Sequence, residues 1–135
     1  MQWDASRHAG FTTGTPWIGV NPNYREINVA AAEEDSDSVL HWYRRLSALR
    51  TAHMTLVYGD YALLEPGERV FAYARTLENE RFTVLLNWSG TATVVELPPD
   101  WAAACVTRVA SNYPDVADAA GRMALKPWEA RLYCR

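Results

Sequence analysis

The sequence has few cysteines, no long apolar run and no excess of basic residues. Its 135 residues include only two cysteines, Cys105 and Cys134, too few for the disulfide framework of a small secreted domain. Both lie in apolar, strand-like contexts, which favours two buried reduced thiols over a disulfide. No apolar stretch reaches the roughly 20 residues that span a bilayer, and no secretory signal is evident. We therefore expect a cytoplasmic protein without a membrane partner.

Basic residues are outnumbered by acidic ones. The chain carries 13 Lys and Arg against 16 Asp and Glu, a formal net charge of −3. A nucleic-acid-binding protein normally presents a basic patch. The cluster of Arg44, Arg45 and Arg50 lies on a predicted helix with acidic residues upstream, so no nucleic-acid partner is expected.

Motifs that indicate catalysis or metal binding are also absent from the sequence. His8, His41 and His53 share no metal-ligand spacing with one another or with the cysteines, and we expect them to be solvated surface residues. No nucleophile elbow, P-loop or dinucleotide-binding glycine motif occurs. The sequence therefore predicts no metal and no cofactor. Asn87-Trp88-Ser89 matches a glycosylation sequon, but without a secretory signal it indicates only the end of a strand.

The most distinctive stretch is residues 1–29, which is dense in aromatic, amide and turn-forming residues. It shows no sustained helical or strand period and predicts a long ordered loop, a kind of segment that usually serves function. Nothing else in the chain is large enough to hold such a loop in place. We therefore expect the chain to be a piece of a larger protein.

One clear helix follows a short helical turn at residues 30–34. It is predicted to run from about Asp37 to Ala52, with Ser36 or Asp37 as its N-cap. Acidic residues near its start and basic residues near its end suit the helix dipole. One face of this helix carries an apolar stripe, which consists of Val39, Trp42, Tyr43, Leu46 and Leu49. Such a stripe needs a second surface to pack against. We expect this stripe to be exposed in the isolated chain or covered by another copy.

From Tyr58 onward the pattern changes to short strands separated by turns, which is typical of an antiparallel β-sandwich. The run Val84-Leu85-Leu86 predicts a strand covered on both faces. A polar, alanine-rich loop is expected from Asn112 to Gly121. The predicted strands are Tyr61–Glu65, Val70–Thr76, Phe82–Asn87, Ala92–Leu97, Cys105–Val109 and Ala130–Tyr133.

Candidate ligand contacts lie in the opening loop, where composition leaves two interpretations open. Trp3, Trp17 and Tyr24 could stack on sugar rings, or they could fasten the loop to its scaffold. The carboxylates Asp4 and Glu26 could approach a ligand, although a lone loop carboxylate is more often a turn or salt-bridge residue.

A family resemblance adds what composition cannot. The chain resembles the oligo-1,6-glucosidase and α-glucosidase branch of glycoside hydrolase family 13, the α-amylase family. The resemblance covers essentially the whole chain and is weakest from about Trp101 to Arg122. It is most specific in the segments Met1-Gln2-Trp3-Asp4, Ala9-Gly10-Phe11-Thr12, Pro16-Trp17, Val20-Asn21-Pro22-Asn23-Tyr24 and Ile27-Asn28-Val29, and it ends with Pro127-Trp128-Glu129-Ala130-Arg131.

The resemblance implies a (β/α)8 catalytic barrel followed by a C-terminal β-sandwich. Residues 1–56 would be the last loop and helix of the barrel, and residues 57–135 the sandwich. The fold class implied for this chain is mainly β, an antiparallel sandwich preceded by one amphipathic helix and a long ordered loop, with the barrel itself missing. The missing barrel, or another copy of the chain, would cover the helix.

The resemblance also implies a function. Members cleave α-glycosidic bonds with retention, using carboxylates on barrel strands upstream of the matched region, so no residue here is assigned a catalytic role. Gln2, Trp3 and Asp4 would lie nearest the sugar site, as support. The chain would be the C-terminal part of an α-glucosidase acting on short α-glucoside oligosaccharides, inactive alone. The alternatives are a stand-alone sandwich that binds carbohydrate or protein, and a subunit that complements a separate barrel; only the glucosidase interpretations explain residues 1–29.

Overall fold

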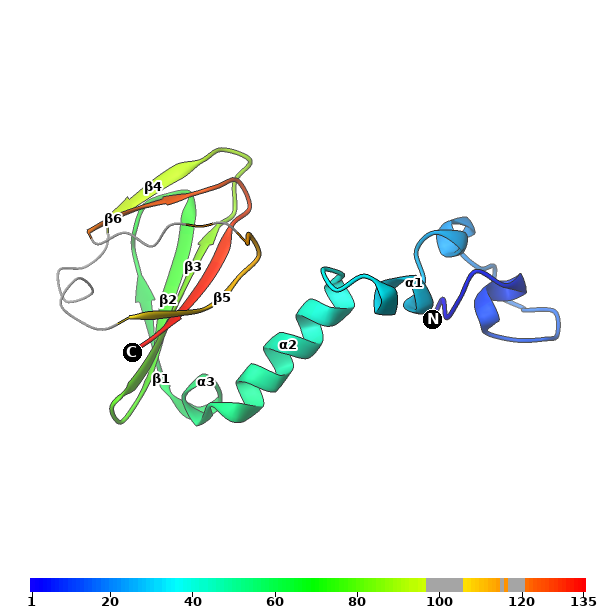
Figure 1. Ribbon diagram of the computed structural model, residues 1–135, viewed down its shortest axis with the longest axis horizontal. Coiled ribbons are helices and arrows are strands. Elements are labelled where there is room, and N and C mark those ends of the chain that lie inside the picture. Colours follow the sequence, from blue (N-terminus) through cyan, green and yellow to red (C-terminus); the bar gives the residue numbers. More distant parts are fainter. Residues whose placement is uncertain (97–105, 115, 117–120) are drawn as a thin grey trace. The chain divides into compact units, whose positions relative to one another are not determined.

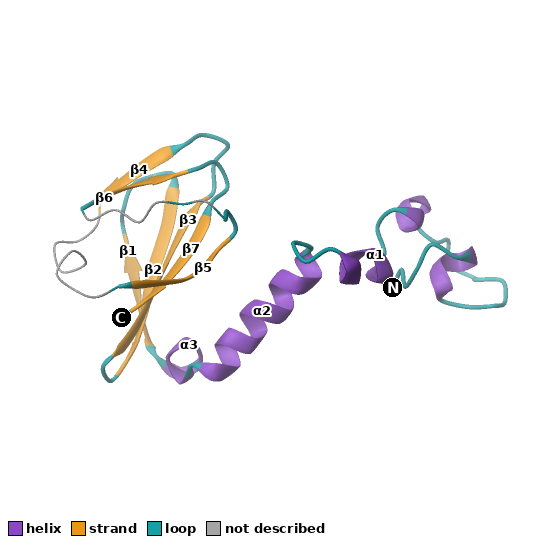
Figure 2. Cartoon of the chain, viewed as in Figure 1, coloured by secondary structure: helices purple, strands orange, loops and turns teal. Residues whose placement is uncertain are grey.

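The computed structural model describes residues 1–96, 106–114, 116 and 121–135. The chain divides into two compact units, Met1–Ala52 and His53–Arg135. Helices and loops make up the first unit, whereas strands dominate the second (Figures 1 and 2). In the described part of the chain, no helix is long and apolar enough to cross a membrane.

The opening loop of the first unit is folded around its own first residues. Two 3-10 turns, η1 at Arg7–Gly10 and η2 at Pro22–Arg25, interrupt it. The Trp3 N–H donates to the Ala9 carbonyl at 2.9 Å, and the Trp3 carbonyl accepts from Ala30 N–H at 2.9 Å. Residues 2–4 thus join both ends of the loop, which accounts for its order without regular secondary structure.

Two helices complete this unit. Helix α1 spans Val29–Glu34 and is capped by the Asn28 side chain, which accepts from Ala31 N–H at 2.9 Å. Helix α2 spans Val39–Ala52, two residues shorter at its start than predicted. The predicted caps Ser36 and Asp37 are wrong, because the Ser38 hydroxyl accepts from the N–H of His41.

Helix α2 leaves its apolar stripe uncovered. It contains no buried residue, and Val39 and Tyr43 are 85% and 72% exposed. Trp42 is half-buried under the Arg45 guanidinium, 4.6 Å from the ring centroid. The expectation of an exposed stripe is confirmed for Val39, Tyr43 and Leu46 in the chain by itself, whereas Trp42 and Leu49 are half-buried.

The second unit begins with a short helix that sequence analysis missed, α3 at Met54–Tyr58. Its strands are all paired antiparallel, in a five-stranded sheet of order β1-β2-β3-β7-β5 and a two-stranded sheet β4-β6. The predicted mainly β fold with an antiparallel sandwich is confirmed. The strands are β1 Asp60–Leu64, β2 Val70–Leu77, β3 Glu80–Asn87, β4 Thr93–Glu96, β5 Thr107–Ser111, β6 Arg122–Leu125 and β7 Ala130–Cys134.

The core draws on both sheets, as expected when two sheets pack face to face. It consists of Val70, Ala72, Leu85, Val95, Met123, Leu125 and Tyr133. The prediction that β3 is covered on both faces holds only at the start of the strand, where Phe82 and Thr83 are both buried. Leu85 is 2% exposed, but Val84 and Leu86 point to the other face and are only half-buried. We call this other face of the five-stranded sheet the outer face.

Some sequence predictions fall outside the described residues. These are Leu97, Cys105 and part of the loop expected from Asn112 to Gly121. Cys134 is described, and its thiol is free and half-buried.

Candidate functional site

Gln2, Trp3 and Asp4 lie at the centre of the opening loop, and each has a different environment. The Gln2 side-chain amide donates to the Asn23 side-chain oxygen at 3.2 Å and also to the Ile27 carbonyl. These bonds fix the far side of the loop to its beginning. Trp3 is held by backbone bonds, but 48% of its surface remains exposed, so it is the member of the three most able to contact another molecule.

Asp4 is used to build the loop. Its carboxylate accepts from the Ser6 N–H at 2.8 Å and from the Ser6 hydroxyl at 2.5 Å. These two bonds hold the pKa of Asp4 below its usual value. Gly10 packs against the same carboxylate at φ +64°, where an added Cβ would lie 2.6 Å from an Asp4 oxygen. A glycine is required there for both conformation and space.

The environments of Trp17 and Tyr24 bear on the two interpretations that composition left open, namely stacking on a sugar and fastening the loop to its scaffold. Trp17 is 93% exposed, so within this chain it does not fasten the loop. Tyr24 is half-buried and its carbonyl accepts from the Asn28 side chain at 2.8 Å. Glu26 is exposed, and Asp4 is committed to Ser6. The loop therefore presents aromatic surface without bringing two carboxylates together.

The histidines are not the solvated surface residues that the sequence predicted. All three are half-buried. His41 Nε2 lies 3.0 Å from the Glu33 carbonyl oxygen, where Arg44 also pairs with the Glu33 carboxylate at 2.9 Å. His53 Nδ1 lies 2.8 Å from a Glu80 carboxylate oxygen.

Glu80 joins α3 to the five-stranded sheet. It accepts from the Thr55 hydroxyl and lies beside His53. The Thr55 bond is the main cause that lowers the pKa of Glu80, burial opposes it, and His53 adds to the lowering. Burial and the Glu80 charge raise the pKa of the nearby Cys134 thiol. Among the described residues, no three His, Cys, Asp or Glu side chains are placed to hold a metal ion.

A buried ion pair fixes the end of the sandwich. Glu129 and Arg131 are 0% and 2% exposed, and Arg131 Nε donates to Glu129 at 2.7 Å. The same guanidinium donates to the Ala124 carbonyl at 2.7 Å, and Glu129 accepts from Lys126 N–H at 2.5 Å. This network ties β6 to β7 and is structural.

Asn87 explains why the sequon does not mark a glycosylation site. Its side chain is 2% exposed at the end of β3. It donates to the carbonyls of Thr91 and Lys126, both at 2.8 Å, and accepts from the N–H and the hydroxyl of Ser89. Every hydrogen-bonding position of this amide is used inside the protein, which supports the interpretation of the motif as a strand end.

Comparison with known protein families connects the loop and the sandwich. Residues 1–59 match the α-amylase catalytic domain family. Residues 61–132, more than half of the chain, match the C-terminal domain of maltogenic amylase. The chain belongs to the α-amylase family, glycoside hydrolase family 13. The resemblance stated from the sequence is therefore confirmed.

Relatives within this family include oligo-1,6-glucosidases. Those of Parageobacillus thermoglucosidasius and Halalkalibacterium halodurans are 49% and 42% identical to the chain, with 98% of it aligned. Solved family members superpose well. Trehalose-6-phosphate hydrolase of Bacillus licheniformis gives a TM-score of 0.88 at 34% identity over 98% of the chain, and isomaltulose synthase of Klebsiella sp. LX3 gives 0.86 at 37% over 99%. The chain spans 24% of each of these four proteins and corresponds to a part of them.

Proposed function

We propose that the chain is the C-terminal part of an α-glucosidase that hydrolyses short α-linked gluco-oligosaccharides, and that it is not catalytically competent alone. The observation that carries this proposal is the pair of adjacent family matches, catalytic domain at residues 1–59 and C-terminal domain at residues 61–132. A stand-alone binding module has no use for the first of them. Relatives named oligo-1,6-glucosidase support the substrate class.

The two segments have separate roles in this proposal. Residues 1–56 are the last loop and helix of the catalytic barrel, and residues 57–135 are the sandwich that stabilises it. Active sites of (β/α)8 barrels lie at the face formed by such loops. The half-exposed ring of Trp3 then borders the sugar site. The bonds of Gln2 to Asn23 and of Asp4 to Ser6 keep that ring in position.

The catalytic carboxylates come from the rest of the barrel. A retaining glycosidase needs two carboxyl groups about 5 Å apart. In the opening loop, Asp4 is bound by Ser6 and Glu26 is exposed, and neither forms such a pair. We place the enzyme in the cytoplasm, where the free thiol of Cys134 stays reduced.

A chimeric enzyme tests the function. The first three quarters of the Parageobacillus oligo-1,6-glucosidase, the part that this chain does not match, are joined to residues 1–135. We expect the chimera to hydrolyse isomaltose, because the chain supplies the missing loop, helix and sandwich. A folded chimera without turnover would contradict the proposal.

Two tryptophans of the same loop separate sugar contact from loop folding. In the chimera, Trp3→Ala is expected to lower kcat/KM about tenfold, which corresponds to about 1.4 kcal/mol of lost transition-state stabilisation. Trp17→Ala is the matched control, since Trp17 is more exposed, and should change kcat/KM much less. Equal losses in both variants would mean that Trp3 only maintains the loop.

A further inference from the structure

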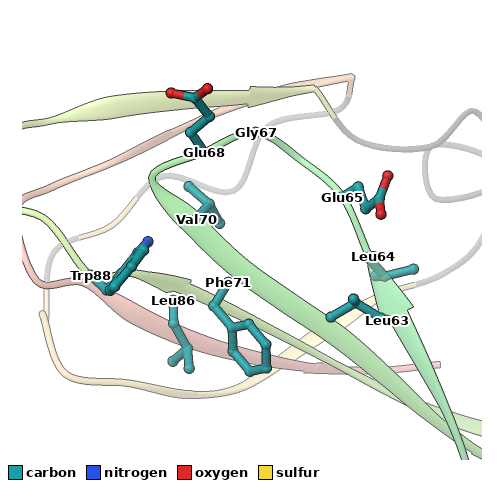
Figure 3. A pocket seen from close by; sticks show the side chains of 9 residues that line it. All are labelled: Leu63, Leu64, Glu65, Gly67, Glu68, Val70, Phe71, Leu86 and Trp88. Carbon is teal, nitrogen blue, oxygen red and sulfur yellow. The ribbon is translucent and has the colours of Figure 1, made fainter.

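Two tryptophans of the sandwich are exposed, and their surroundings differ. Trp88 and Trp128 are 65% and 63% exposed. Trp88 lines an apolar groove of about 670 Å³ together with Phe71 and Leu86 (Figure 3), and a continuous apolar surface of this kind is typical of a protein interface. Trp128 lies instead in the turn between β6 and β7, and its exposure needs a separate explanation.

The backbone of Trp128 is in the left-handed region, at φ +57°. Glycine adopts this conformation freely, whereas a bulky residue is strained by it. The exposed indole also gains little free energy from burial. The local structure of the turn therefore does not favour a tryptophan here, and a strained, exposed residue indicates a functional role for its side chain.

Hydrogen bonds fix the backbone of Trp128 on both sides. Its N–H donates to the Ser89 carbonyl at 3.1 Å, and its carbonyl accepts from the Asn112 side-chain amide at 2.9 Å. The oxygen of the same amide accepts from the Ala130 N–H at 2.8 Å. The residue is thus held in place before a ligand binds, which lowers the entropy cost of binding.

The indole of Trp128 lies beside the turn that joins β3 to β4. A Cβ added to Gly90 would lie 3.7 Å from the indole nitrogen, and 3.8 Å and 3.9 Å from two ring carbons. Glycine leaves this side-chain position vacant, so a ligand can reach the indole from solvent.

The neighbours of this indole are polar. Asn112 and Lys126 are exposed, and both belong to the same arrangement, since Asn112 binds the Trp128 carbonyl and the Lys126 carbonyl accepts from the Glu129 N–H at 3.2 Å. A sugar ring has an apolar C–H face bordered by hydroxyl groups, which a flat indole with hydrogen-bonding neighbours matches. A protein partner matches less well, because the centre of a protein interface is a larger apolar patch.

We propose that Trp128 is a sugar-binding residue whose indole stacks on one pyranose ring of an α-linked gluco-oligosaccharide. The inference goes beyond the proposed function by giving the sandwich a sugar contact of its own, and the choice of glucose units rests on that function. Stacking on a single indole gives weak binding, with a Kd in about the millimolar range.

The indole N–H signals of the isolated chain in a proton–nitrogen correlation NMR spectrum test this contact. Isomaltotetraose is the probe, and W128F and W88F assign the two signals. We expect the Trp128 signal to shift saturably and the Trp88 signal to stay in place. W128A should weaken the apparent affinity at least about tenfold, and W88A, which removes a similarly exposed indole, should change it less than about twofold.

Trp128→Gly separates sugar binding from a structural role of the indole. Because glycine tolerates φ +57°, we expect this variant to unfold at the same or a higher urea concentration than the unmodified chain and to lose the response to isomaltotetraose. Unfolding at a lower urea concentration, together with an unshifted Trp128 signal in the unmodified chain, would mean that the indole only stabilises the turn.

These results do not depend on turnover. An unshifted or unsaturable Trp128 signal overturns the inference even if the chimera hydrolyses isomaltose, and so does an unchanged affinity in W128A. A saturable shift beside an inactive chimera supports the sugar contact and counts against the proposed function. A Trp128 signal that moves with chain concentration, and not with isomaltotetraose, identifies a second copy of the chain as the partner and overturns the inference.

Discussion

Removing one partner of the buried Glu129–Arg131 pair should strongly destabilise the sandwich, and removing the second charge should restore part of its stability. Both side chains are almost fully buried, with a 2.7 Å bond between them. Arg131→Met leaves the Glu129 carboxylate buried without its counter-charge, which costs about 3–5 kcal/mol. A unit of this size has about 4–12 kcal/mol of stability in total, so the single variant loses a large part of it.

The double variant E129Q/R131M removes both charges and keeps an acceptor for the Lys126 N–H. Its remaining cost comes from the Ala124 carbonyl and the Tyr133 hydroxyl, which both lose a donor from Arg131, and amounts to about 1–3 kcal/mol. We therefore expect the double variant to be more stable than R131M by about 2 kcal/mol. Urea unfolding followed by tryptophan fluorescence measures both. If the double variant is equal to R131M or less stable, the pair does not act as a charge-compensated unit and the reasoning is wrong.

Three further predictions concern helix docking, pH and association. Gly59→Ala should destabilise the chain by about 1–3 kcal/mol, because its Cβ would lie 2.5 Å from the Thr55 carbonyl oxygen, whereas Gly19→Ala meets nothing within 4 Å and should be neutral in the same unfolding assay. The Thr55 bond lowers the pKa of Glu80 in the folded state, so the stabilisation from ionised Glu80 is present above about pH 4.3, the usual glutamate pKa, and is lost as the pH falls. Glu80→Gln should therefore flatten the dependence of stability on pH between about pH 5 and 3. An unchanged slope in this acid range would contradict the prediction. The exposed stripe of α2 should make the isolated chain associate as its concentration rises, and light scattering should show less association for Tyr43→Lys; a clean monomer at all concentrations would count against it.

The sandwich was predictable because its strands are short, apolar and separated by strong turn signals. β2, β3 and β7 lie within two residues of their predicted bounds. Strand β6 was missed because Arg122–Leu125 is only four residues long, too short to show a period. Helix α3 was missed for a similar reason, since five residues of Met54–Tyr58 include β-branched and aromatic side chains that favour strands.

The candidate site was less accessible to pattern reasoning. Asp4 and Gln2 are polar residues of an irregular loop. Nothing in their sequence spacing indicates that Asp4 binds Ser6 or that Gln2 binds Asn23 and Ile27. The partial exposure of the outer face was also hidden, because Val84 and Leu86 look like core residues in the sequence. Local periodicity identifies apolar residues that favour burial, but it does not show which other residues bury them.

Glucose release from isomaltose by the purified chain, with the chimera assayed beside it, tests the central claim most directly. The account predicts that the chain alone gives no turnover above a heat-killed control, because the opening loop brings no two carboxylates together, while the chimera is active. Turnover by the chain alone would contradict it, since the catalytic groups would then have to lie within these 135 residues.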